Sequence, residues 1–473
     1  MIHFSLSLGI MRGRVYTRKG RYVLALHIHF VGIKGTGMSA LAQISVQIEG
    51  AIITGSDVEE SFYTDSVLKR AQIPVLNFSP SNVENVDLVV ASAAYTNQHP
   101  EIARARELNI PVLTYPQYLG RLLAKKRGIS VAGTHGKTTT TAMIGLVMLQ
   151  AELDPTIVVG SDVPSIGGNA HAGKGEFFLA ESCEYRRHFL NYSPEHLIIT
   201  NIEFDHPDYF TDLEDVRSAF SELAKKVPAD GHIYIWAEDP SLEYITGASP
   251  ITTFGLSESA DVRATEIVFK DEKSSMKIML KGEYVGDLDL NVPGRHNIIN
   301  ALATIALCHE TGIPIEQILG SLSLFNGTKR RFEHLGSNQN GALIVDDYAH
   351  HPTEIRTTLE GARLSFPDRR IRAIFQPHTF SRTEKLLQEF SQAFQAADEV
   401  VVADIFSSAR EQGHHTVSAH TLATLIQQQG IQACYIGTLD EIKVYLTETI
   451  APEDLVLTLG AGDIYKVGLG IVS

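Results

Sequence analysis

The chain has little of what an extracellular or membrane protein would need. It contains three cysteines, Cys183, Cys308 and Cys434, which lie far apart and form no CxxC pair. This pattern argues against a disulfide framework and favours a reducing, cytoplasmic environment. A run of about 18 or more apolar residues is also missing, so we do not expect membrane insertion.

The chain also has fewer basic than acidic residues. Lysine and arginine total 40 against 55 acidic residues, which gives a net charge of -15 over 473 residues. A surface of this sign repels a phosphate backbone, so nucleic acid is not expected as a partner, although local loops can still bind small anions. The length predicts about three domains of roughly 150 residues each, and an oligomer remains possible.

The pattern of apolar residues divides the chain into an extension and three units. Residues 1–23 place an apolar run before a basic one, the reverse of a signal peptide, and we expect a loose extension there. Residues 24–122 and 328–473 alternate β-branched runs with amphipathic stretches, which predicts parallel, Rossmann-like α/β domains. Residues 123–327 predict a P-loop-type α/β domain, to which the two-residue alternation at about 250–292 adds an antiparallel sheet.

A glycine-rich turn follows the first strand expected in the 24–122 domain. In HFVGIKGTGMSALAQ, Gly32, Gly35 and Gly37 separate this strand from a helix, whose N-terminus attracts phosphate. Asp57 ends the next strand in TGSD, where a carboxylate can accept a ribose hydroxyl. The glycine spacing differs from G-x-G-x-x-G, so a diphosphate is favoured over NAD, with a purely structural turn as the alternative.

A shortened phosphate loop, GTHGKTTTT, opens the central domain. Val131 stands where the first glycine of G-x-x-x-x-G-K-[ST] would be. The motif still offers backbone donors, a cation for the phosphates and a hydroxyl for Mg²⁺, from Gly133, Thr134, Gly136, Lys137 and Thr138. We expect triphosphate binding, because a threonine-capped helix start would leave the adjacent Gly-Lys-Thr unexplained.

Acidic residues and a histidine follow at two later strand ends. LAESCEYRRHF contains Glu181 and Glu184, and NIEFDHPDYF contains Asp205, His206 and Asp208. Magnesium that bridges phosphates prefers carboxylates and water, and a histidine is admissible. A lone histidine is more often structural, but the phosphate loop and the carboxylates make His206 a metal candidate.

Further polar residues stand at the ends of later elements. PGRHNIINA places His296, Asn297 and Asn300 at a helix start, either as caps or as readers of an adenine edge. NGTKRRFE places Arg330 and Arg331 at the hinge into the third domain, either to close over phosphates or as a solvated face. DDYAHHPTE, QPHTFSR and GAGD end strands of the third domain, so that side of its sheet is expected to carry polar function.

Together these motifs resemble the Mur ligases of bacterial cell-wall synthesis, from about residue 27 to the C-terminus. GIKGTGMSALA, GTHGKTTTT, CEYRRHFLNY, FDHPDYF, PGRHNIINA, KRRFE, DDYAHHPTE and FQPHTFSR occur in the order of the family, which uses the short loop A-G-T-x-G-K-[ST]. Ser221 stands where other members carry a carbamylated lysine. The resemblance therefore implies the branch that uses ATP and Mg²⁺ to join L-alanine to UDP-N-acetylmuramate. The alternatives are another nucleophile, such as a recycled tripeptide, or, in a different class, a Rossmann oxidoreductase.

The resemblance also implies roles for individual residues. Those expected to bind the UDP-sugar are Gly35, Thr36, Gly37, Met38, Ser56, Asp57 and His135. Those expected to bind ATP are Gly133, Thr134, Gly136, Lys137, Thr138, Thr139, His296, Asn297, Arg330 and Asp347. The amino acid is expected to meet Tyr348, His351, His378 and Arg382, and the metal to meet Thr138, Glu181 and His206. The expected catalytic residues are Lys137, Glu181, His206, Arg331 and Arg382.

Overall fold

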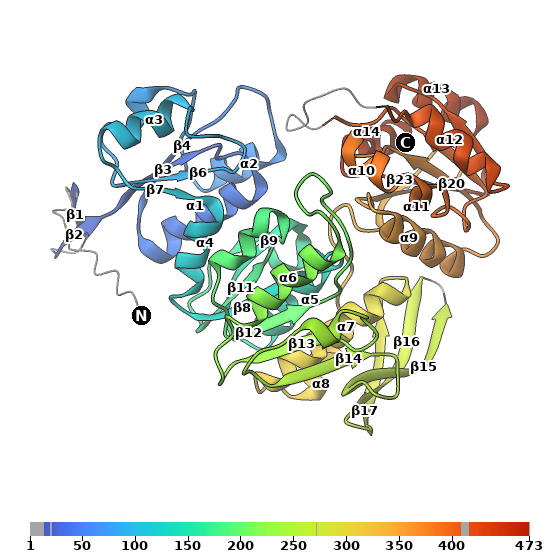
Figure 1. Ribbon diagram of the computed structural model, residues 1–473, viewed down its shortest axis with the longest axis horizontal. Coiled ribbons are helices and arrows are strands. Elements are labelled where there is room, and N and C mark those ends of the chain that lie inside the picture. The colour runs from blue at the N-terminus through green and yellow to red at the C-terminus, as the bar shows by residue number, and fades with distance from the viewer. Residues whose placement is uncertain (1–13, 19–20, 271, 408–415, 473) are drawn as a thin grey trace.

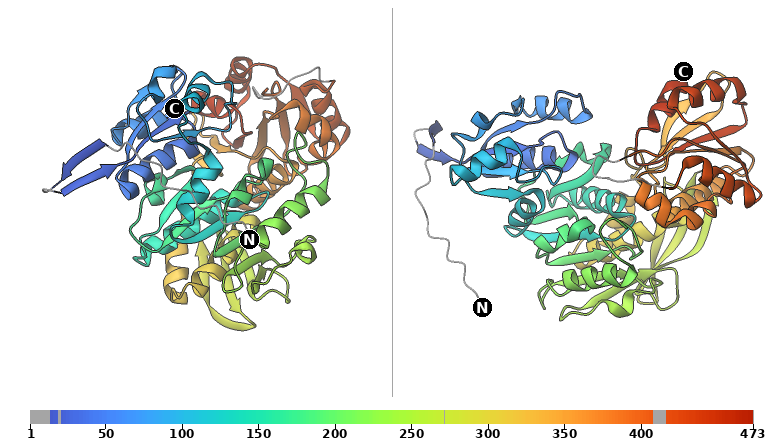
Figure 2. Two further views of the ribbon diagram at one scale, coloured as in Figure 1. Left: turned by 60° about the vertical axis from the view of Figure 1, so that its left-hand side comes forward. Right: turned by 45° about the horizontal axis from the view of Figure 1, so that its top comes forward.

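The computed structural model describes residues 14–18, 21–270, 272–407 and 416–472, and it shows three α/β units (Figure 1). The first and third units lie on opposite sides of the central one, as the views in Figure 2 also show. The parallel and mixed sheets confirm the α/β fold class expected from the sequence. Within the described ranges, no helix is both long and apolar enough to cross a membrane.

The N-terminal segment contains a small antiparallel ribbon. Strands β1 (Arg14–Arg18) and β2 (Arg21–Ala25) pair with each other and form a sheet of their own. The sequence suggested only a loose extension here. Residues 1–13 and 19–20 of that extension lie outside the described part of the chain.

The first unit is a five-stranded parallel sheet in the order β5-β4-β3-β6-β7. Its strands are β3 (His27–Val31), β4 (Ile52–Ser56), β5 (Val75–Leu76), β6 (Leu88–Ala91) and β7 (Val112–Thr114). Its helices are α1 (Thr36–Glu49), α2 (Tyr63–Arg70), α3 (Pro100–Glu107) and α4 (Tyr115–Leu123), with the 3₁₀ turn η1 (Pro80–Val83). Because α1 follows β3 after a short turn, its N-terminus lies at the carboxyl edge of the sheet.

The central unit is a ten-stranded sheet in the order β10-β9-β11-β8-β12-β13-β14-β15-β16-β17. The strands are β8 (Arg127–Ala132), β9 (Thr156–Val163), β10 (Gly168–His171), β11 (Phe177–Glu181), β12 (His196–Ile199), β13 (His232–Trp236), β14 (Ile251–Gly255), β15 (Val262–Lys270), β16 (Lys273–Leu280) and β17 (Glu283–Leu290). Pairing from β9 through β11, β8, β12, β13 and β14 to β15 is parallel, and β15 to β17 are antiparallel, as the change in alternation predicted.

Helices cover both faces of the central sheet. They are α5 (Lys137–Gln150), α6 (Leu213–Ala224), α7 (Arg295–Glu310) and α8 (Ile315–Leu322), with η2 (Pro164–Ile166), η3 (Tyr185–Asn191) and η4 (Leu242–Tyr244). Apolar residues of α5, α7 and α8 pack together against one face. The core of the other face continues into the first unit, through residues such as Leu119 and Leu122 of α4. This shared core fixes the first unit against the central one.

The third unit is a six-stranded sheet in the order β18-β19-β23-β20-β21-β22, with only β18 antiparallel. Its strands are β18 (Glu333–Ser337), β19 (Leu343–Asp347), β20 (Arg370–Phe375), β21 (Glu399–Val402), β22 (Gln432–Tyr435) and β23 (Asp454–Leu459). Its helices are α9 (Pro352–Ser365), α10 (Phe380–Lys385), α11 (Leu387–Ser391), α12 (Ala419–Gln428), α13 (Leu439–Thr449) and α14 (Tyr465–Ile471). Separate apolar clusters fill its two faces, so it has a core of its own.

Candidate active site

The phosphate loop connects β8 to α5 in the centre of the molecule. Gly133 and Gly136 have φ of 134° and 79°, values that favour glycine. A Cβ at Gly133 would also lie 1.9 Å from Thr200 Oγ1, so a larger residue does not fit there. The backbone N–H groups of Thr134 and His135 donate to Asn201 at 2.9 Å each. These bonds anchor the loop, and the first turn of α5 presents its N–H groups to a phosphate.

Lys137 begins α5 and is largely buried, with 14% of its side chain exposed. Its Nζ donates to the carbonyls of Gly133 and Thr134 and forms an ion pair with Glu184 at 3.0 Å. Burial alone lowers the pKa of Lys137, but Glu184 raises it above the ordinary value. The side chain therefore remains a cation, positioned where the loop would hold a nucleotide phosphate.

Two groups of oxygen and nitrogen ligands lie beside this lysine. Thr138 Oγ1 donates to the Glu181 carboxylate at 3.0 Å, which also accepts the N–H of Gly160 at 2.7 Å. His206 Nε2 lies 3.6 Å from Glu184, which thereby contacts both Lys137 and this histidine. A threonine hydroxyl with a carboxylate suits Mg²⁺, and histidine beside carboxylate is an acceptable second set. The residues expected to hold the metal therefore fit it.

A cavity of about 270 Å³ lies between the first and central units. Its lining includes four of the residues expected to bind the UDP-sugar, Gly35, Thr36, Gly37 and Met38. The same cavity is lined by Tyr115, Glu181, Cys183, His188 and Tyr192. The glycine turn of the first unit is thus brought to the carboxylate of the phosphate-loop site.

The other three residues expected at the UDP-sugar do not line this cavity. Asp57 accepts the backbone N–H of Lys34 at 2.6 Å, which ties the glycine turn to the end of β4. Ser56 is fully buried and donates to Glu101 at 2.5 Å. His135 lies in a second cavity, described next. Their assignment to the UDP-sugar stays a prediction.

The second cavity, of about 400 Å³, lies between the central and third units. Among the residues expected to bind ATP, its lining includes Gly136, Thr139, His296, Asn297 and Asp347. Burial lowers the pKa of His296 to about 4 and raises the pKa of Asp347 to about 6. His296 is therefore neutral near pH 7. The carboxylate of Asp347 accepts the backbone N–H groups of Phe332 and Ala349, which fix its position.

Sequence reasoning missed the apolar wall of the second cavity. Trp236, at the end of β13, lines it together with Leu256, Val292 and Phe325. Trp236 Nε1 is buried and has no hydrogen-bond partner among the described residues. The only signal in the sequence was that this is the single tryptophan of the chain, at the end of a β-branched run.

The two arginines at the hinge point in different directions. Arg330 forms an ion pair with Asp346 at 3.0 Å and donates to the carbonyl of Gly460, so it is held within the third unit. Arg331 lines the second cavity, with its guanidinium 3.8 Å from Glu354. The structure thus brings Arg331, and not Arg330, to the expected nucleotide residues.

The residues expected to meet the amino acid divide into two groups. Arg382 Nε donates to Asp205 Oδ1 at 2.8 Å and Nη1 lies 3.4 Å from His378 Nδ1. His350 packs between Tyr348 and His378, with ring centroids 5.2 Å and 6.1 Å apart. Sequence reasoning missed His350, although it adjoins the histidine that was chosen.

His351 belongs to a different neighbourhood. Its ring centroid lies 4.7 Å from that of His135, and its Nε2 lies 3.2 Å from the carbonyl oxygen of Phe204. His135 contacts Glu354 at 3.2 Å and Glu203 at 3.5 Å. Burial alone would lower the pKa of His135, but these two carboxylates raise it to about 9.

Three family models cover almost the whole chain. They are the Mur ligase family catalytic domain at residues 27–127, the Mur ligase middle domain at residues 131–308, and the Mur ligase glutamate ligase domain at residues 330–462. This chain belongs to the Mur ligase family. The resemblance inferred from the motifs is confirmed.

Individual relatives of this Mur ligase are similar over nearly their full length. A UDP-N-acetylmuramate–L-alanine ligase of Desulfitobacterium hafniense (strain Y51) is 72% identical over 449 residues, which cover 95% of this chain and all of that protein. The crystal structure of a UDP-N-acetylmuramate–alanine ligase from Thermotoga maritima has a TM-score of 0.80 at 31% identity and covers 94% of this chain and 98% of that one. A murein peptide ligase from Psychrobacter arcticus has a TM-score of 0.71 at 26% identity, with coverages of 95% and 100%.

Proposed function

We propose that this Mur ligase joins L-alanine to the lactyl carboxylate of UDP-N-acetylmuramate, with conversion of ATP to ADP and phosphate, in peptidoglycan precursor synthesis. The observation that carries the proposal is the position of the phosphate loop. Thr138 contacts Glu181, which lines the cavity of the glycine turn, while Gly136 lines the second cavity. A UDP-sugar in the first cavity and ATP in the second would therefore meet at Lys137. The names of the 72% identical relative and of the Thermotoga maritima structure support this reaction.

The reaction has two steps. A carboxylate oxygen of the lactyl group attacks the γ-phosphorus of ATP, ADP leaves, and an acyl phosphate forms. The amine of L-alanine then attacks the acyl carbon, the tetrahedral intermediate expels phosphate, and the amine loses a proton. Both reactants of the first step are anions, so fixed positive charge must offset their repulsion.

The chain supplies much of that positive charge itself. Lys137 is a largely buried cation at the loop, and Arg331 lines the second cavity. Magnesium, when bound, adds a divalent charge on the phosphate oxygens, and Thr138, Glu181 and His206 are the residues that would hold it. Asp205 forms an ion pair with Arg382, and Glu184 forms one with Lys137, so the negative charge of both carboxylates is compensated.

The remaining assignments follow the two cavities. Gly35, Thr36, Gly37 and Met38 line the cavity proposed for the UDP-sugar, and His296, Asn297 and Trp236 line the one proposed for the adenosine of ATP. Tyr348, His350, His378 and Arg382 are proposed to receive L-alanine. His135 and His351 lie together in a separate cluster, and their predicted contacts with the UDP-sugar and with L-alanine stay predictions.

One assay distinguishes this function from its nearest rival. The enzyme is given UDP-N-acetylmuramate, ATP and Mg²⁺ with L-alanine, glycine or a cell-wall tripeptide, and phosphate release is measured. We expect L-alanine to be used best, with a modest preference over glycine of about 1 to 3 kcal/mol, because one methyl group gives a pocket little to bind. A tripeptide that is used faster than L-alanine would identify a murein peptide ligase, and absence of phosphate release with every acceptor would refute the ligase reaction.

Replacing Asp57 with alanine should affect one substrate selectively. The carboxylate holds the glycine turn through Lys34 N, and a charge-assisted hydrogen bond of this kind contributes about 1.5 to 3 kcal/mol. We expect the KM for UDP-N-acetylmuramate to rise about 10- to 150-fold, while the KM for ATP changes little. Steady-state kinetics with each substrate varied in turn gives both values. Asp57→Asn keeps an acceptor and should be milder, whereas an equal rise in both KM values would contradict separate sites.

A further inference from the structure

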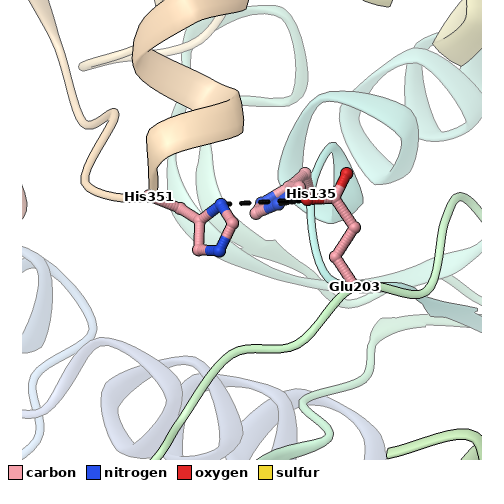
Figure 3. A group of neighbouring side chains, drawn as sticks. All are labelled: His135, Glu203 and His351. Carbon is pink, nitrogen blue, oxygen red and sulfur yellow. Dashed lines mark ion pairs between the residues drawn. The ribbon is translucent and has the colours of Figure 1, made fainter. Parts of the chain in front are cut away.

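Three potential metal ligands from two units converge at the edge of the second cavity, the one proposed for ATP (Figure 3). His135 comes from the phosphate loop, Glu203 from the segment after β12, and His351 from the residue before α9. His135 Nε2 lies 3.5 Å from Glu203 Oε2, and His351 Nδ1 lies 3.9 Å from the same oxygen. All three ligand atoms lie within 4.8 Å of one another. No chemical step of the proposed ligase reaction is assigned to this cluster.

The spacing is close to that of a metal centre. Ligand atoms bound tetrahedrally at about 2.0 to 2.1 Å from Zn²⁺ lie roughly 3.4 Å apart. The two separations from Glu203 exceed this by about half an ångström or less, and the two histidine nitrogens lie within 4.8 Å of each other, so side-chain rotations would complete the geometry. His135 Nε2 is buried, and within the described part of the chain it forms no hydrogen bond shorter than its 3.5 Å ion pair with Glu203.

The residues that hydrogen-bond to the three proposed ligands are arranged as they are in known metal sites. A ligating histidine usually donates its other ring N–H to a carboxylate or a backbone carbonyl. His135 Nδ1 lies 3.2 Å from Glu354 Oε1, and His351 Nε2 lies 3.2 Å from the carbonyl of Phe204. Thr353 Oγ1 donates to Glu203 Oε2 at 2.7 Å, which orients the carboxylate. The competing bond to His351 Nδ1, from Thr353 N, is long at 3.3 Å.

We propose that His135, Glu203 and His351 form a binding site for a divalent transition metal ion of the Zn²⁺ class. Two imidazoles and one carboxylate suit Zn²⁺ or Co²⁺ better than Mg²⁺, which prefers oxygen ligands. The site is distinct from Thr138, Glu181 and His206, and it joins the third unit directly to the phosphate loop. A bound ion holds α9 against the loop and fixes one edge of the nucleotide cavity.

The full-length protein, in excess Mg²⁺ and without nucleotide, is titrated with Co²⁺ and then with Zn²⁺. We expect one Co²⁺ per chain with the strong visible absorption of a four-coordinate site, and its displacement by Zn²⁺. Calorimetry in buffers of different ionisation enthalpy should show release of about one proton per Zn²⁺, because His135 must lose its proton to bind. Absence of a saturable cobalt spectrum would overturn the proposal.

Substitutions of the proposed ligands test where the metal ion binds. His351→Asn removes the imidazole but keeps a good N-cap for α9, and Glu203→Gln preserves shape, so both should fold. Each is expected to weaken Co²⁺ binding at least about 100-fold, and Glu354→Gln about 10- to 100-fold. Circular dichroism verifies that each variant is folded.

Two controls separate this site from other histidines. His206→Ala alters the proposed Mg²⁺ set, and His334→Ala removes a surface histidine paired with Glu272 at 2.9 Å. Both should keep wild-type Co²⁺ affinity. Loss of binding in His206→Ala with retention in His351→Asn would place the ion at the proposed Mg²⁺ residues Thr138, Glu181 and His206 and refute the proposal. Because the readout is spectroscopic, this result is independent of whether L-alanine is the substrate.

Discussion

Replacing Lys137 with alanine is expected to lower the rate of phosphate release by about 10³- to 10⁵-fold, the range measured for loss of a phosphate-stabilising arginine. The side chain is a largely buried cation at the start of α5, close to where the transferring phosphate would lie. Its removal leaves the negative charge of the transition state uncompensated and also leaves Glu184 without its lysine partner. Steady-state phosphate release with L-alanine and UDP-N-acetylmuramate measures the effect.

Lys126 provides a matched control, because it lies just before β8, away from the phosphate loop that follows this strand. Its Nζ donates to Thr156 Oγ1 at 2.9 Å and to the carbonyl of Gly173 at 2.8 Å. Lys126→Ala should keep activity close to that of the wild type. If Lys137→Ala folds and retains activity within about tenfold of the wild type, the role assigned to the phosphate loop is wrong.

The sequence predicted the fold well because local patterns determine these elements. The alternation of β-branched runs with amphipathic stretches marked parallel strands in each of the three units, and the change of period near residue 250 marked β15 to β17. Motifs that follow strands were placed correctly at carboxyl edges, because parallel strands bring those edges together. The short phosphate loop was recognisable from Gly133, Gly136 and Lys137 alone.

Contacts between residues that are far apart in the sequence could not be predicted from such patterns. Glu184 was noted in the sequence, but its position between Lys137 and His206 depends on how η3 turns after β11. The pair of Asp205 and Arg382 joins residues of different units, and nothing local in either segment indicates the other. Contacts of this kind depend on the relative placement of two separately folded sheets, which periodicity does not encode.

The guanidinium of Arg382 has two candidate partners, the carboxylate of Asp205 and the α-carboxylate of L-alanine. In this structure it makes a two-point contact with Asp205, through Nε at 2.8 Å and Nη2 at 3.2 Å. The α-carboxylate of L-alanine offers the same paired oxygens, which match a guanidinium equally well. If Arg382 binds the substrate carboxylate, Asp205 competes with L-alanine for it. The two residues should then have opposite effects on the KM for the amino acid.

Arg382→Ala is therefore expected to raise the KM for L-alanine by roughly 30- to 5,000-fold, which corresponds to the loss of about 2 to 5 kcal/mol for a buried charge pair. Asp205→Asn should lower that KM, because it frees the guanidinium, and neither variant should change the KM for ATP comparably. Arg382→Lys should not restore activity fully, since lysine lacks the paired donors. Arg363→Ala, which breaks the surface pair with Asp398, serves as the control and should leave the KM for L-alanine unchanged. If Arg382 only holds the third unit against the central one, Arg382→Ala and Asp205→Asn will instead raise the KM values for L-alanine and ATP together.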